Sequence, residues 1–303
     1  MGNDAPIFGT ADLLVRTLAA RLPARPGYAL TRILTPRIDA GRRRWLGERA
    51  AAAVLEYLED PAAARATADR FVVELACDDL DGLATRYRSE STRRGAVSVH
   101  GVEHIPANGP LVLTSFHFSG GFGVFDLLRA SGRNPLFLHA PVEPPSRRYP
   151  RRMAEARSDY LRRHFDPAWI EPGPGAREAL DRTLSEGGTV VGLLDVAPDR
   201  LEVRDRLPGQ LLGRPLELPA GLLRLAADHR ATVVPYHGRL ENDVRILEIE
   251  PPLHGRSVED LVEQTLARCE AVIRKRPWIW QNWLDVDGLF AFRESGPGDR
   301  SEE

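Results

Sequence analysis

The stretch Pro110-Leu111-Val112-Leu113-Thr114-Ser115-Phe116-His117-Phe118-Ser119-Gly120-Gly121-Phe122-Gly123-Val124-Phe125-Asp126 decides the fold. Its apolar start, bounded by Asn108-Gly109-Pro110, predicts a buried strand, and Val124 to Arg129 predicts the first turns of a helix. A glycine-rich turn that carries His117 lies between them. Sites in open α/β sheets lie beyond the carboxyl ends of the strands. His117 is therefore the first candidate for a catalytic residue, with a structural or solvated histidine as the alternative.

The same alternation of strands and helices continues along the chain. Further strand patterns lie at 97–102, 136–139, 189–194, 231–237 and 244–249, with helical spacing between most of them. This order predicts an α/β fold with a central mixed, mostly parallel sheet and helices on both faces. Residues 1–95 have helical spacing and predict an N-terminal layer packed on a core at 96–294. Residues 295–303 are polar and predict a disordered tail, so we expect one structural domain overall.

The composition excludes several classes of protein. A formal net charge of −2 over 303 residues does not favour nucleic acid as a partner. Cys77 and Cys269 lie far apart and predict neither a zinc site nor a disulfide framework. The chain has no long apolar run and no secretory signal, so we expect a cytoplasmic protein, soluble or peripherally attached to the inner face of the membrane. Nearly all basic residues are arginine, which indicates a bacterial genome of high GC content.

Two basic regions each allow two interpretations. Residues 147–163 carry seven arginines, Arg162 and Arg163 among them, which form either a solvated helix face or a landing site for phosphate or an acidic carrier protein. The cluster Arg42-Arg43-Arg44 beside Trp45 belongs either to a plain helical layer or to an amphipathic patch that contacts an anionic membrane surface.

Four sequence blocks, in order, carry a resemblance to a known family. The first is the strand and histidine block 111–126, and the second runs from Arg177 through Gly187-Gly188 and a strand to Asp195. The third begins at Leu212-Gly213-Arg214-Pro215, and the fourth is Arg276-Pro277-Trp278-Ile279-Trp280-Gln281-Asn282-Trp283. Together they resemble the bacterial late acyltransferases of lipid A biosynthesis and the phosphatidylinositol mannoside acyltransferases, within the lysophospholipid acyltransferase superfamily. The blocks span roughly residues 97–283.

The resemblance implies transfer of an acyl group from a thioester to a hydroxyl or amine. The donor would be the phosphopantetheine thioester of an acyl or peptidyl carrier protein or of coenzyme A, with no permanently bound cofactor and no metal. The acceptor would be a lipid, such as a glycolipid, or a small molecule of a specialised pathway. This small molecule would be either bound to a carrier protein or free. A histidine at a strand end acts as general base in this family, since a neutral imidazole can take the proton of an attacking alcohol. A non-catalytic acyl or carrier-protein binder and a thioesterase are the alternatives.

The chain departs from the family at the partner of this histidine. The family places a carboxylate in the pattern His-x4-Asp/Glu, but Phe122 stands five residues after His117 and the first acid is Asp126. If the glycines form a longer loop, Asp126 comes within reach of His117, and we expect this arrangement. Otherwise His117 acts alone, takes an acid from elsewhere, or belongs to a dead site.

Other candidates are carried over by position. Asp195 matches the family's aspartate at the end of the next core strand, where we expect it to bind substrate; the alternative is an acid that caps the following turn. Arg162 or Arg163 lies near a substrate-holding arginine of the family. Ser115 and Ser119 flank His117, so an acyl-serine intermediate stays open. We expect them to contact substrate together with Gly120 and Gly121. The tryptophans of the last block predict core residues or a wall of an acyl channel.

Overall fold

The computed structural model describes residues 10–35, 37, 40–139, 169–173, 175–197 and 205–290. None of the helices in these ranges is long and apolar enough to cross a membrane. The basic segment at 147–163, with Arg162 and Arg163, lies outside the described residues, as does the tail at 295–303.

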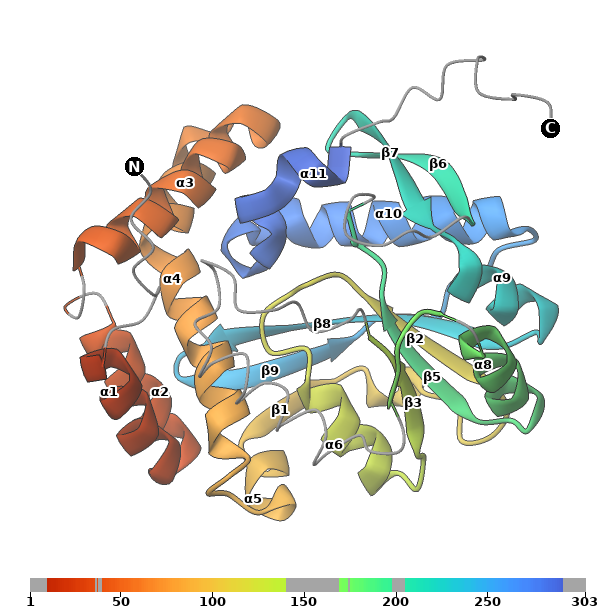
Figure 1. The fold of residues 1–303 in the computed structure, drawn as a ribbon, viewed down its shortest axis with the longest axis horizontal. Helices are drawn as coiled ribbons and strands as arrows, with labels where there is room; N and C mark the ends of the chain where they lie inside the picture. The colour runs from red at the N-terminus through yellow and green to blue at the C-terminus, as the bar shows by residue number, and fades with distance from the viewer. Residues whose placement is uncertain are drawn as a thin grey trace.

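The chain forms the expected α/β fold around a mixed, mostly parallel sheet of seven strands (Figure 1). The spatial order is β1 (Val97–His100), β9 (Val244–Ile249), β8 (Thr232–Glu241), β2 (Leu111–Ser115), β5 (Thr189–Leu193), β3 (Pro135–Leu138) and β4 (Trp169–Ile170). The pair β8 and β9 is antiparallel, and every other neighbouring pair is parallel. The predicted fold class is therefore confirmed.

Strand β2 lies in the middle of the sheet and is buried along its whole length. Successive side chains of a strand point to opposite faces, and β2 follows this rule. Leu111 and Leu113 belong to one apolar cluster, with Val124 and Phe125 of α6 (Gly123–Ala130). Val112 belongs to the other, which also holds residues of α8 (Ala176–Ser185), α9 (Gly221–Asp228) and α10 (Val258–Lys275). Both faces of the sheet are thus covered by helices.

Helices also fill the N-terminal third of the chain, as the spacing predicts. They are α1 (Thr10–Arg21), α2 (Ala24–Leu34), α3 (Ala40–Leu58), α4 (Pro61–Ala84) and α5 (Glu90–Arg94). Helix α4 begins at an N-cap, Asp60, whose side chain accepts from the backbone N–H groups of Ala62 and Ala63. Figure 1 shows α4 crossing one end of the sheet, with α1 and α2 on its outer side. Helix α4 therefore forms a wall beside the end of β8.

One stretch differs from what its sequence indicates. The charged and proline-rich residues between Asp195 and the third block are typical of a loop, and Leu218 to His229 has the spacing of a helix. Instead, β6 (Arg206–Leu211) and β7 (Arg214–Pro219) form an antiparallel hairpin, and α9 starts only at Gly221. After α10, the chain continues in the short helices η2 (Pro277–Ile279), η3 (Gln281–Asp285) and α11 (Val286–Phe290). This last segment passes the carboxyl end of β2, since Phe118 bridges to Trp280.

Candidate active site

His117 stands two residues beyond the end of β2, at the carboxyl edge of the sheet. Its backbone is held at both ends: its carbonyl accepts from the N–H of Gln281 at 2.8 Å, and its own N–H donates to the Asp195 carboxylate at 2.9 Å. The side chain is 29% exposed, so solvent or a ligand can reach the ring. The predicted position of His117 at the mouth of the sheet is thus where the structure places it.

Asp195 is the carboxylate that contacts the imidazole, with 2.7 Å between Asp195 Oδ1 and His117 Nδ1. The register of the sheet explains the pairing. Ser115 at the end of β2 lies beside Leu193 at the end of β5, in parallel register. Two further residues along each chain bring His117 and Asp195 side by side. A sequence separation of 78 residues becomes direct contact because the two strands are neighbours.

The Asp195 carboxylate is buried, with only 1% of the residue exposed, and it is surrounded by donors. Trp280 Nε1 donates to Oδ2 at 2.8 Å, and Asn282 Nδ2 donates to the same oxygen at 2.8 Å. Buried carboxylates need such partners, because an unpaired buried charge is costly. The Trp280 and Asn282 of the last sequence block are therefore supports for Asp195, a role that the sequence analysis missed.

The contact with Asp195 also assigns the tautomer of His117. An ionised carboxylate only accepts hydrogen bonds, so Nδ1 carries the proton. Nε2 is then the ring nitrogen that can accept a proton from another molecule. This arrangement of carboxylate, Nδ1 proton and bare Nε2 is what a histidine general base requires.

Asp126 does not take the place that we expected for it. Both of its carboxylate oxygens accept from the guanidinium of Arg93 on α5, each at 3.0 Å. The physical reason is the position of the helix start. Helix α6 begins at Gly123, directly after the turn Gly120 to Phe122, so the glycines do not form a longer loop. Asp126 then lies in the first turn of α6, where its side chain faces Arg93 of α5. The structure therefore agrees with the alternative in which His117 pairs with an acid from elsewhere in the chain, which is Asp195.

The serines beside His117 face the protein interior. Ser115 Oγ donates to the carbonyl of Tyr236 at 2.7 Å and is 2% exposed. Ser119 Oγ donates to Glu74 at 2.8 Å, and the residue is fully buried. Neither hydroxyl is thus placed for the acyl-serine intermediate that the sequence left open. Of the two predicted glycines, Gly120 donates its N–H to Asp78, and Gly121 lines the cavity in front of His117.

His117 opens onto a cavity of about 90 Å³. One wall is acidic and comes from α4, with Asp78, Asp79 and Asp81. The other is mostly aromatic and comes from the segments around β2, β3 and α6. Its phenylalanines are Phe116, Phe118, Phe122, Phe125 and Phe137. Phe122, at the family's carboxylate position, packs against Phe125 with 6.2 Å between the ring centroids. Phe122 therefore forms part of the apolar wall of the cavity.

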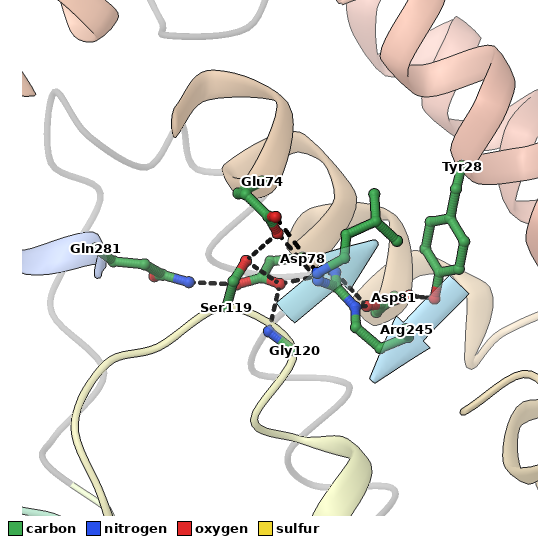
Figure 2. A network of polar contacts seen from close by, with 9 residues as sticks. Tyr28, Glu74, Asp78, Asp81, Ser119, Gly120, Arg245 and Gln281 are labelled. Atoms are coloured by element: carbon green, nitrogen blue, oxygen red, sulfur yellow. Dashed lines mark hydrogen bonds and ion pairs between the residues drawn. The ribbon is translucent and has the colours of Figure 1, made fainter. Parts of the chain in front are cut away.

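A buried polar network lies directly behind the acidic wall (Figure 2). Arg245 of β9 contacts three carboxylates of α4: Glu74 at 3.2 Å, Asp78 at 2.9 Å and Asp81 at 2.8 Å. Burial raises the pKa of Asp78 to about 7, with further contributions from Asp81 and Glu74, while Arg245 opposes the shift. Burial likewise raises the pKa of Glu74. Both acids are buried and share one arginine, which explains why Glu74 and Asp78 hold their protons more tightly than in water.

The raised pKa of Asp78 predicts a pH-dependent effect of Asp78→Asn on stability. The folded protein binds the Asp78 proton more tightly than the unfolded chain, whose carboxyl has the ordinary value of 3.8. The stabilisation by this proton is complete below that value and is lost as the pH rises to about 7. The free energy of unfolding of Asp78→Asn, relative to wild type, should therefore increase between pH 4 and 7.5. The upper bound of this increase in the free energy difference is on the order of 4 kcal/mol. Urea unfolding across this range measures it, and a difference that is constant with pH would contradict the assignment.

Comparisons with known proteins give a similarity among solved structures and none among families or curated sequences. No protein-family model matches the sequence, and no curated protein matches it. Among solved structures, the chain is similar to the 1-acyl-sn-glycerophosphate (LPA) acyltransferase PlsC from Thermotoga maritima. The two share 15% sequence identity at a TM-score of 0.37, over 88% of this chain and 94% of that chain.

Proposed function

We propose that this protein is an acyltransferase in which His117 is the general base and Asp195 is its positioning partner. The observation that carries the proposal is the 2.7 Å contact between His117 Nδ1 and a buried carboxylate, at the mouth of a cavity with a large apolar wall. The acyl donor is a thioester of phosphopantetheine, on a carrier protein or on coenzyme A. The acceptor is a hydroxyl or amine of a lipid or of a small molecule.

The geometry supports a direct transfer. His117 Nε2 takes the proton of the acceptor O–H or N–H while the acceptor attacks the thioester carbonyl carbon. The buried Asp195 carboxylate stabilises the imidazolium that forms. Collapse of the tetrahedral intermediate breaks the carbon–sulfur bond, and the leaving thiolate takes the proton from Nε2. The products are the acylated acceptor and the free thiol, and the imidazole is neutral again.

Location and partners form part of the same proposal. The protein acts in the cytoplasm or at the inner membrane surface, with arginines of 147–163 as the docking site for phosphate or a carrier protein. Three side chains support contact with a bilayer surface, since Leu14, Leu18 and Trp45 are 61%, 50% and 53% exposed. Sedimentation with anionic vesicles tests this contact, and a protein that stays in the supernatant would argue against it.

The experiment that tests the function measures thiol release from acyl thioesters. Purified protein is incubated with acyl-coenzyme A or acyl carrier protein, with and without a panel of glycolipid and amine acceptors. We expect thiol release that depends on the acceptor, and an acylated acceptor in the mass spectrum. Release of free acid without an acceptor would identify a thioesterase instead. Binding of the thioester without turnover under every condition would identify a non-catalytic binder.

A further inference from the structure

One carboxylate outside the pair of His117 and Asp195 touches both segments that hold the histidine. Asp78 accepts from the N–H of Gly120 at 2.7 Å, in the turn that follows His117. It also accepts from the side-chain amide of Gln281, whose backbone N–H donates to the His117 carbonyl at 2.8 Å. Figure 2 shows Asp78 between these two partners, with Arg245 on its other side. Asp78 therefore joins the turn and the C-terminal segment at the point where they meet His117.

The turn itself is tightly confined. Gly120 adopts a left-handed conformation with φ of 72°, and a Cβ at this position would lie 2.5 Å from Arg245 Cδ. On the opposite side, Gly238 of β8 leaves room for the backbone of the turn, since a Cβ there would lie 2.4 Å from the Ser119 carbonyl oxygen. The turn is thus held between β8, Arg245 and Asp78. Its orientation depends on the network of Figure 2.

We propose that Asp78 is a positioning residue for His117, and that the charge of its carboxylate controls how firmly the turn after His117 is held. The inference rests on the proposed function for its kinetic consequences. The contacts fit the ionised carboxylate, because the backbone N–H of Gly120 and the guanidinium of Arg245 can only donate. Both donate to Oδ1, so a proton is accepted most readily at Oδ2. Oδ2 is the oxygen that accepts from Gln281, and protonation there weakens this hydrogen bond, because a neutral carboxyl oxygen is a poorer acceptor than a carboxylate.

The surroundings of Asp78 place this change near neutral pH. The charged and titratable groups that face it come from four directions. On its own helix are Glu74, Asp79 and Asp81, and the other groups are Arg245 of β9, Tyr28 of α2 and His117. Burial and the neighbouring acids raise the pKa of Asp78 to about 7. Burial also raises the pKa of Tyr28, which therefore stays neutral in this range. We thus expect the ionisation of Asp78 to appear on the acid side of the activity profile.

The test compares Asp78→Asn with Tyr28→Phe in the full-length protein. The Tyr28 hydroxyl donates to Asp81 at 2.5 Å, so its removal disturbs the same network at the end away from the turn. We expect Asp78→Asn to lower kcat about tenfold or more at pH 8 with little change in KM, and Tyr28→Phe to stay within about twofold of wild type. Below a pH of about 7, log kcat/KM should rise more steeply with pH in wild type and Tyr28→Phe than in Asp78→Asn.

Four outcomes decide against the inference or separate it from the proposed function. Wild-type kcat and slope in Asp78→Asn would overturn it, and equal losses in both variants would reduce Asp78 to a structural role. If His117→Ala abolishes turnover while Asp78→Asn does not change it, only the inference fails. If His117→Ala retains full turnover, the proposed function fails.

Two further measurements keep the inference testable without the first variant or without turnover. Should Asp78→Asn not fold, Gln281→Ala removes the same hydrogen bond and should also make the rise of log kcat/KM with pH less steep. The ¹⁵N NMR signals of the His117 ring require no substrate. In wild type they should show an inflection near the pKa of about 7 of Asp78. The absence of an inflection near this pH would contradict the coupling.

Discussion

His117→Ala is expected to lower kcat by 10²–10⁴-fold, which is the usual contribution of a positioned general base. The variant keeps the backbone N–H that donates to Asp195, so the fold around the site should be preserved. KM for the thioester should change little, because the imidazole acts on the acceptor. Stopped or continuous assays of thiol release measure kcat and KM, and circular dichroism checks the fold. Acceptor-dependent turnover at the wild-type rate would exclude His117 as the base.

Asp195→Asn is expected to have the second largest effect, with a loss of kcat of about 10²-fold or more. The amide carries no charge, so it stabilises the imidazolium less. Its NH₂ group also donates and cannot accept from the donors that surround this position. Trp280 Nε1, Asn282 Nδ2 and the His117 N–H all donate to the carboxylate. At least one of them loses its partner, so we expect a fall in the free energy of unfolding of roughly 1–3 kcal/mol.

Kinetics and stability must be measured together for this variant. The loss of kcat has to appear in protein that is shown by circular dichroism to be folded at the assay temperature. A folded Asp195→Asn protein with wild-type kcat would show that the carboxylate has only a structural role.

Much of the sheet could be predicted because its strands are short apolar runs with clear ends. Leu111 to Ser115 and Thr189 to Leu193 are such runs, and both form buried central strands. The hairpin of β6 and β7 could not be predicted from the sequence, because Pro208, Gly209 and Pro215 are residues that usually indicate a loop. Its pairing is a tertiary effect, with Gly209 lying against α10 at Leu266.

The histidine could be found from the sequence, but its partner could not be chosen. Asp126 is near His117 in sequence and Asp195 is distant, so local spacing favoured Asp126. The correct choice needs the fact that β2 and β5 are neighbours in parallel register. With that fact, Ser115 beside Leu193 places His117 beside Asp195. The sequence already predicted a helix from Val124, and a helix that starts there leaves no room for a longer glycine loop before Asp126.

The contributions of Trp280, Asn282 and Asp78 also depend on contacts between residues that lie far apart in the sequence. Trp280 reaches Asp195 across 85 positions, and Asp78 reaches Gly120 across 42. A tryptophan or an aspartate on a helix has no local pattern that indicates such a contact. The last sequence block carried the resemblance, and that was the available signal for Trp280 and Asn282. For Asp78 we find no signal in the sequence.

The most direct test of the central claim compares Asp195→Asn with Asp126→Asn in one assay of acceptor-dependent thiol release. Both substitutions remove one carboxylate near the site, but Asp126 pairs with Arg93 and Asp195 pairs with His117. The pairing in the structure predicts a kcat within about threefold of wild type for Asp126→Asn and a loss of about 10²-fold or more for Asp195→Asn. The reverse order, with Asp126→Asn inactive and Asp195→Asn active, would contradict the assignment of Asp195 as the partner of the base.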